Sequence, residues 1–103
     1  MLIGFTLFRE KILSGEKRQT IRLKRKRVPK AGEPLYLYWK LRTKECMLLK
    51  KVVCKEVIPI TWATMRDNLQ LAKEDGFETL EEFRKWFSRY NPKDDTEFLV
   101  IRW

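Results

Sequence analysis

The sequence contains no histidine and only two cysteines, Cys46 and Cys54, among its 103 residues. Two thiols without an imidazole cannot complete the four ligands of a structural zinc site, so we expect no metal and no cofactor. We predict that both cysteines are small buried hydrophobic side chains. Histidine is also the most frequent general base at neutral pH. Proton transfer in this chain must therefore rely on lysine or a carboxylate.

Long apolar runs are also missing. No segment approaches the roughly 20 apolar residues that span a membrane. The opening MLIGFTLFREK turns charged too soon to be a signal peptide. We therefore predict a cytoplasmic protein with no membrane partner. Hydrophobic residues make up 44% of the chain, including four Trp, six Phe and three Tyr. That is enough for the core of one domain, residues 1–103.

Acidic residues are scarce in the first part of the chain. Residues 1–60 carry 16 basic and five acidic side chains, a net charge of +11, whereas residues 61–103 carry seven and nine, a net charge of −2. This separation favours a basic face for a polyanion such as RNA. The run KRKR, residues 24–27, is either a solvated strand end or a phosphate contact. A charged fraction of 36% with few Asn and Gln resembles proteins of heat-loving organisms.

Alternation of apolar and polar residues predicts several strands. They are expected at residues 2–5, 18–25 and 35–40, in one or two strands between 46 and 60, and at 98–103. In 18–25, Ile21 and Leu23 face one way and Thr20, Arg22 and Lys24 the other. Pro59 is expected to end its run. The segment 98–103 is almost continuously apolar, which is typical of an inner strand.

Helical spacing predicts three helices. The first is capped by Thr6 and ends at Gly15, the second covers 62–75, and the third begins with Thr79 and carries an apolar stripe. The stripe, which consists of Leu80, Phe83, Trp86, Phe87 and Tyr90, is typical of core packing. Strands and helices do not alternate regularly, so we predict an α+β fold: a small mixed β-barrel with helices on its outside.

One eight-residue stretch, GEKRQTIR, carries the strongest functional signal. Its residues Gly15, Lys17, Thr20 and Arg22 resemble the GxKxxExR signature of ASCH domains, with threonine in place of glutamate. The flanking segments KILSGEK, PKAGEPLYLYW, AKEDGF and FLVIRW are similar to that family as well, so the resemblance covers nearly the whole chain. It implies a PUA-like β-barrel with flanking helices and a cleft for RNA or a nucleotide.

The threonine form resembles the branch of the family that includes N-acetylcytidine amidohydrolases. That resemblance implies a catalytic set of Lys17, Thr20 and a carboxylate from the segment AKED. Asp75 matches the carboxylate best, and Glu74 is one position away. A ribonuclease is a third, weaker alternative.

Catalysis by this set makes a demand on the fold. A lysine with a pKa near 10.4 is protonated at neutral pH, and lowering the pKa to about 7–8 takes roughly 4 kcal/mol. Exposed charges are screened too strongly to supply that energy. Lys17 must therefore lie in a partly dry cleft, and it must lie in the turn before the strand to share a face with Thr20.

Binding makes a smaller demand. In a binding module Gly15, Lys17, Arg22 and Lys24 would contact phosphates. Tyr36 or Tyr38 would offer a ring to an unstacked base, although we favour packing within the strand as the role of at least one of them. We therefore expect a partner that is RNA or a nucleoside or nucleotide, and we leave the oligomeric state open.

Overall fold

Six short strands form where the sequence alternates or is rich in apolar residues. The computed structural model describes all residues from 1 to 103. The strands are β1 (Leu2–Phe5), β2 (Gln19–Leu23), β3 (Pro34–Trp39), β4 (Met47–Val53), β5 (Glu56–Thr61) and β6 (Glu97–Arg102).

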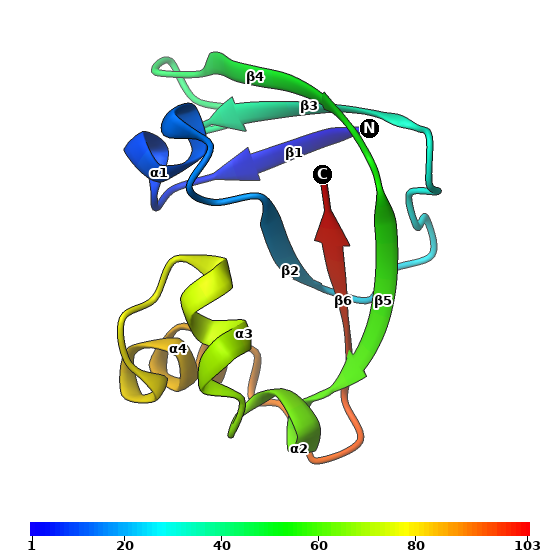
Figure 1. The fold of residues 1–103 in the computed structure, drawn as a ribbon, viewed down its shortest axis with the longest axis vertical. Helices are drawn as coiled ribbons and strands as arrows, with labels where there is room; N and C mark the ends of the chain where they lie inside the picture. The colour runs from blue at the N-terminus through cyan, green and yellow to red at the C-terminus, as the bar shows by residue number, and fades with distance from the viewer.

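The strands form two three-stranded sheets (Figure 1). In the first sheet β3 is central, with β1 parallel on one side and β4 antiparallel on the other. In the second sheet β6 is central and antiparallel to both β2 and β5. Only Cys54 and Lys55 separate β4 from β5, so that these two strands form one long curved run that passes from sheet to sheet.

The expected α+β class is confirmed, but the sheets do not close into a barrel. The edge strands β1 and β2 make no backbone ladder with each other. Instead the side chain of Arg22 crosses between them, and its Nη2 donates a hydrogen bond to the carbonyl oxygen of Gly4 at 2.5 Å. A guanidinium group thus links the two edges where a closed barrel would have paired backbone.

The prediction that Pro59 ends its strand was wrong. Pro59 lies inside β5, opposite Leu99 of β6. β5 is an edge strand, and a proline is tolerated there because the open side of an edge strand needs no N–H donor.

Strand β6 is buried on both faces, which confirms the prediction of an inner strand. Phe98 and Val100 belong to a core that also contains buried side chains of the helices. Leu99 and Ile101 point the other way, into a second core between the two sheets. This double coverage explains why the sequence of the strand is almost continuously apolar.

Four short α-helices and one 3-10 turn complete the fold. They are α1 (Arg9–Ser14), α2 (Trp62–Met65), α3 (Leu69–Asp75), α4 (Leu80–Phe87) and the 3-10 helix η1 (Ser88–Tyr90). No helix combines the length and the hydropathy needed to cross a membrane. The Oγ1 atom of Thr79 accepts a hydrogen bond from the backbone of Glu82 at 3.2 Å, as the predicted N-cap of α4 requires.

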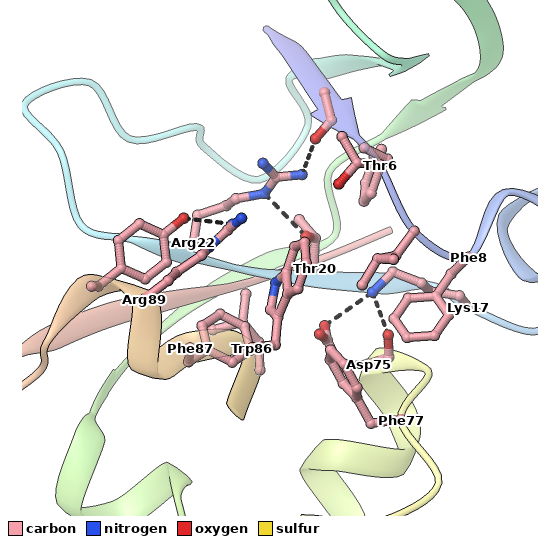
Figure 2. A pocket seen from close by; sticks show the side chains of 15 residues that line it. Thr6, Phe8, Lys17, Thr20, Arg22, Asp75, Phe77, Trp86, Phe87 and Arg89 are labelled. Carbon is pink, nitrogen blue, oxygen red and sulfur yellow. Dashed lines mark hydrogen bonds and ion pairs between the residues drawn. The ribbon is translucent and has the colours of Figure 1, made fainter. Parts of the chain in front are cut away.

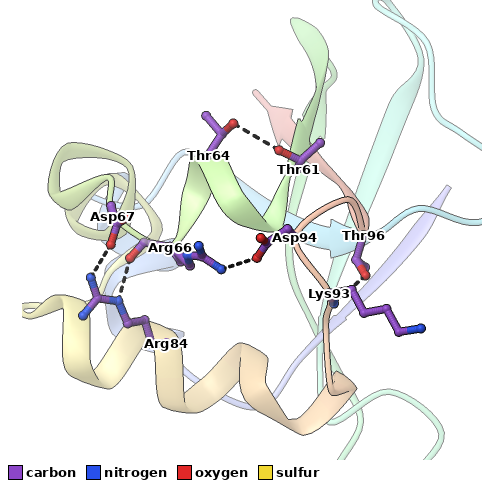
Figure 3. Close-up of polar contacts among 8 residues, drawn as sticks. All are labelled: Thr61, Thr64, Arg66, Asp67, Arg84, Lys93, Asp94 and Thr96. Carbon is purple, nitrogen blue, oxygen red and sulfur yellow. Dashed lines mark hydrogen bonds and ion pairs between the residues drawn. The ribbon is translucent and has the colours of Figure 1, made fainter.

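The single helix predicted over 62–75 is two helices separated by a break. Asn68 caps α3, because its side chain accepts a backbone hydrogen bond from the first turn at 3.0 Å. Arg84 of α4 holds the break in place: its Nε donates to the carbonyl of Arg66 at 2.8 Å, and its Nη2 pairs with Asp67 at 2.6 Å (Figure 3). Periodicity does not detect such a break, since apolar side chains continue to recur across it.

Helix α1 ends as predicted but begins later. Gly15 follows it with a φ of 83°, the left-handed conformation that glycine adopts without strain. The start at Arg9 means that Thr6 is not the cap. Phe8 precedes the helix with a φ of 64°, and Thr6 lies at the edge of a cavity instead.

Candidate functional site

A cavity of about 240 Å³ lies where the end of β1, the start of β2, the end of α3 and the α4–η1 segment meet. Its polar lining includes Lys17, Thr20, Arg22, Asp75 and Arg89, and its walls include the rings of Phe5, Phe8, Phe77, Trp86 and Tyr90. Figure 2 shows the labelled side chains converging on this space. The cavity therefore combines a few charged groups with mostly aromatic walls.

Lys17 and Asp75 form a buried ion pair in the cavity. The Nζ atom of Lys17 lies 3.1 Å from Oδ1 of Asp75 and also donates a hydrogen bond to the backbone carbonyl of Asp75 (Figure 2). Only 3% of the Lys17 side chain and 5% of the Asp75 side chain are exposed. Lys17 lies in the turn between α1 and β2, as convergence with Thr20 requires, and its backbone N–H donates to the carbonyl of Lys11.

The end of α3 positions the carboxylate. Asp75 is the last residue of the helix, and Gly76 follows it with a φ of 112°. The carbonyl of Gly76 accepts a hydrogen bond from Nζ of Lys11 at 2.8 Å, which ties this corner to α1. The ring of Phe8 packs so closely on Gly76 that a Cβ atom there would lie 3.0 Å from it. The position of Asp75 is therefore fixed by both the helix end and the packing.

Burial moves the pKa values of the pair toward each other. It lowers the pKa of Lys17 below its usual 10.5, although the charge of Asp75 opposes the change. It likewise raises the pKa of Asp75 above its usual 3.8, against the opposing charge of Lys17. The charged and neutral forms of the pair are thus closer in free energy than they would be in water. Such a pair is better suited to exchanging a proton than the same two groups in water.

The Oδ1 side of the Asp75 carboxylate is enclosed. Oδ1 faces the Nζ atom of Lys17 at 3.1 Å, although this contact is not a hydrogen bond of regular geometry, and Oδ1 is closed to solvent. Asp75 lines the cavity, so its carboxylate contributes negative charge there beside the ammonium group of Lys17.

Thr20 and Arg22 lie side by side because they are two residues apart on β2. The Nε of Arg22 donates a hydrogen bond to Oγ1 of Thr20 at 3.1 Å, and its guanidinium lies 4.9 Å from the centre of the Phe5 ring. Thr20 is 4% exposed and makes no hydrogen bond to Lys17 or Asp75. Its hydroxyl proton is therefore available to a ligand, since the oxygen already accepts from Arg22.

Three cavity residues were not predicted from the sequence. The guanidinium of Arg89 lies over the ring of Trp86 at 4.0 Å and over that of Tyr90 at 4.8 Å, and it donates to the Tyr90 hydroxyl at 2.8 Å. The stripe that we assigned to core packing is divided: Phe83 is buried in the core, whereas the buried Phe87 and the half-buried Trp86 and Tyr90 line the cavity. Trp and Tyr carry polar atoms that favour partly solvated positions, whereas Phe carries none. This difference in residue type is the signal that could have identified Trp86 and Tyr90 as cavity residues.

The structure also separates Asp75 from Glu74. The carboxylate of Glu74 lies 3.5 Å from the guanidinium of Arg102, outside the cavity. Successive residues of a helix point about 100° apart, so only one of the two can face Lys17. Of the two candidates, Asp75 is the one in the cavity.

The other predicted binding residues do not line the cavity. Lys24 pairs with Glu97 at 2.8 Å on the surface, and Gly15 serves as the end of α1. Tyr36 and Tyr38 lie half-buried on β3, where the ammonium group of Lys51 sits 5.4 Å from the centre of the Tyr36 ring. Neither tyrosine lines the cavity.

Nowhere do three His, Cys, Asp or Glu side chains gather in a way that could hold a metal ion. Comparison with protein-family models, with curated proteins and with solved structures finds no match to this chain. Any functional assignment therefore depends on the cavity and on the motif that contributes to it.

Proposed function

We propose that the chain is an ASCH-type protein that binds RNA or a nucleotide, with one base held in the cavity described above. The observation that carries the proposal is the combination of aromatic walls with the buried ion pair of Lys17 and Asp75 in one cavity. We further propose that the fold is a PUA-like barrel left open between β1 and β2. The six strands, the flanking helices and the motif support this assignment.

The size of the cavity favours a single base or nucleoside. At about 240 Å³ it is smaller than the roughly 300–1,000 Å³ of pockets for drug-sized ligands. The half-buried rings of Trp86 and Tyr90 offer surfaces for stacking, which contributes about 1–3 kcal/mol per base. A base in this position must be unstacked from its neighbours, as is usual in recognition of single strands.

The polar groups complement the edge of a base. The carboxylate of Asp75 lines the cavity, and a carboxylate suits an amino group such as that of cytosine or adenine. The Lys17 ammonium and the Thr20 hydroxyl are donors for the ring nitrogen or carbonyl beside that amino group. Arg22 lies next to Thr20 and supplies the cation for an attached phosphate.

Calorimetric titration with the four nucleoside 5′-monophosphates tests the proposal. We expect at least one of them to bind in a 1:1 ratio, and we expect Trp86→Ala to weaken that binding. Single-stranded RNA should bind with a log–log salt slope of about −0.7 per phosphate contact. The absence of heat with all four monophosphates, together with salt-independent or absent RNA binding, contradicts the proposal.

A second candidate is an amidohydrolase that removes an acyl group from N-acetylcytidine or a similar nucleoside. It is favoured by one specific observation, the presence of Lys17, Thr20 and Asp75 in a single cavity. Neutral Lys17 would take the proton of the Thr20 hydroxyl as Oγ1 attacks the acyl carbon, and would return it to the leaving amine. Water would then hydrolyse the acyl-threonine, and Arg22 would stabilise the oxyanion in both steps. Thr20 makes no hydrogen bond to Lys17 in this structure, which is why binding is the first proposal.

Hydrolysis can be tested with N-acetylcytidine and four variants. If the chain is this enzyme, wild type releases cytidine and acetate, Thr20→Ser keeps part of the activity, and Lys17→Ala and Thr20→Val lose it. The control is Glu74→Gln, which changes the charge of the neighbouring residue outside the cavity and should leave the rate unchanged. No cytidine from wild type, or an equal rate for Lys17→Ala, excludes the chemistry and leaves the binding proposal intact.

A further inference from the structure

A second and larger cavity, of about 540 Å³, lies between the unpaired edges of β1 and β2. We call it the seam groove. Leu2, Ile3 and Gly4 border it from β1, and Arg22 and Leu23 border it from β2. Edge strands carry backbone N–H and C=O groups that lack ladder partners, so both sides of the groove offer hydrogen bonds as well as side chains.

The charged residues of the seam groove are all arginines. Arg22, Arg25, Arg27 and Arg42 line it, and no acidic residue does. Arg25 and Arg42 are exposed and make no ion pair, and Arg27 reaches Glu33 only at 3.4 Å. Exposed arginines without counter-ions are available to pair with the phosphates of a polyanion. The groove is therefore complementary to phosphate groups.

The floor of the groove is apolar. Leu23, Leu99 and Ile101 contribute to it, and Leu2 at its border is 59% exposed. An apolar floor below a cationic rim matches a single nucleic-acid strand, whose sugars and base faces are apolar while its phosphates are charged. Inorganic phosphate alone would leave the floor uncovered.

The groove adjoins the first cavity. The two spaces share Gly4, Arg22 and Tyr90 in their linings. Arg22 donates one hydrogen bond to Thr20 and one to Gly4, which leaves three of its five N–H groups without a partner. Arg22 can thus hold the phosphate between a base in the cavity and the next nucleotide in the groove.

We infer that the seam groove binds the sugar–phosphate chain of single-stranded RNA on one side of the nucleotide whose base enters the cavity. The preferred ligand is then an oligonucleotide and not a free nucleoside or mononucleotide. This inference depends on the proposed function, because the cavity fixes where the strand begins. Arg25 and Arg42 contact phosphates, and Arg22 connects the two sites.

The test is fluorescence anisotropy or calorimetry with the four nucleoside 5′-monophosphates and the four homotrinucleotides of RNA. The variant Arg25→Gln/Arg42→Gln removes two charges from the groove, and its matched control Lys26→Gln/Lys44→Gln removes two charges from exposed side chains outside it. We expect a trinucleotide to bind more tightly than the corresponding monophosphate. We expect the arginine variant to weaken the trinucleotide severalfold, to make its salt slope shallower by about 1.4, and to leave the monophosphate unchanged.

The outcomes separate the two proposals. If a monophosphate binds but the trinucleotide binds no better, or the lysine control loses as much affinity as the arginine variant, the seam groove is not a strand site and the cavity proposal stands. Trinucleotide binding that depends on Arg25 and Arg42 but not on Trp86 supports the groove and contradicts the cavity. No binding of either ligand overturns both.

Discussion

Lys17 and Asp75, 58 residues apart in the sequence, hold their opposite charges 3.1 Å from each other, with only 3% and 5% of their side chains exposed. A buried pair of this kind is costly to assemble, because both ions lose their hydration. It also brings together the first, basic part of the chain and the helical part at one point. The pair therefore has consequences for stability, for pH dependence and for binding that can be measured separately.

The first consequence is that the stability lost on removing one charge depends on whether the other charge is present. Lys17→Met leaves Asp75 buried without a counter-ion and should lower the free energy of unfolding by about 3 kcal/mol. Lys17→Met/Asp75→Leu removes both charges and should cost less than Lys17→Met alone. Urea denaturation of four proteins, wild type, Lys17→Met, Asp75→Leu and the double variant, measures the difference. A double variant that loses the sum of the two single effects would show that the residues do not interact.

The second consequence is a pH dependence of definite sign. The folded protein binds the Lys17 proton less tightly than the unfolded chain does, so the contribution of Lys17 to stability grows as the pH rises toward 10.5 and falls as the pH drops below it. Asp75 has a raised pKa, so its contribution is largest below pH 3.8 and is lost as the pH rises above that value. In the Lys17→Met variant only the pH dependence contributed by Asp75 remains. The stability of wild type relative to Lys17→Met should therefore increase from pH 7 to pH 9.5, and urea denaturation at both pH values measures it. A constant or decreasing difference would contradict a lowered pKa of Lys17.

Gly76 offers a test of how the cavity is positioned. Gly76 and Gly32 both have positive φ, 112° and 91°, so alanine is strained at either position. Only at Gly76 would the added Cβ meet another group, the ring of Phe8 at 3.0 Å, while Gly32 has open space around it. We expect Gly76→Ala to lower the melting temperature more than Gly32→Ala, and to weaken nucleotide binding as well. Equal shifts in melting temperature, with binding intact in both, would show that the contact with Phe8 does not position the site.

Trp86 should report on the occupied cavity. Stacking of a base on its half-buried ring is expected to quench its fluorescence, and Trp86→Phe should remove most of the change. Trp39 is a suitable control, because it is also half-buried but lies outside the cavity. Trp39→Phe should keep the quenching of wild type. If Trp86→Phe kept the quenching and Trp39→Phe removed it, the ligand would bind at another surface.

Local patterns in the sequence predicted the local structure well. The glycine at position 15 ends α1 because only a residue free to adopt positive φ suits that position, and Lys17 then falls in the turn, where it can face Thr20. The apolar run of β6 correctly indicated an inner strand. These features depend on a few neighbouring residues, so the sequence alone carries the information.

Features that depend on distant contacts were not predictable in the same way. The open seam depends on Arg22 meeting the carbonyl of Gly4, and no spacing in the sequence indicates that a side chain will take the place of a backbone ladder. Periodicity showed that one face of α4 is apolar, but it could not show that Trp86 would face a cavity while Phe83 faces the core. The choice between Glu74 and Asp75 likewise needed the direction of α3, which tertiary packing decides.

The most direct test is nuclear magnetic resonance of the side-chain nitrogen of Lys17 in protein labelled with ¹⁵N-lysine. The resonance is assigned by its loss in Lys17→Arg, and that of the exposed Lys26 serves as the reference. On addition of the nucleoside 5′-monophosphate that binds in calorimetry, we predict a large shift of the Lys17 resonance and none of the Lys26 resonance. A Lys17 resonance that stays unchanged at saturating nucleotide would contradict the claim that the buried pair is the binding site.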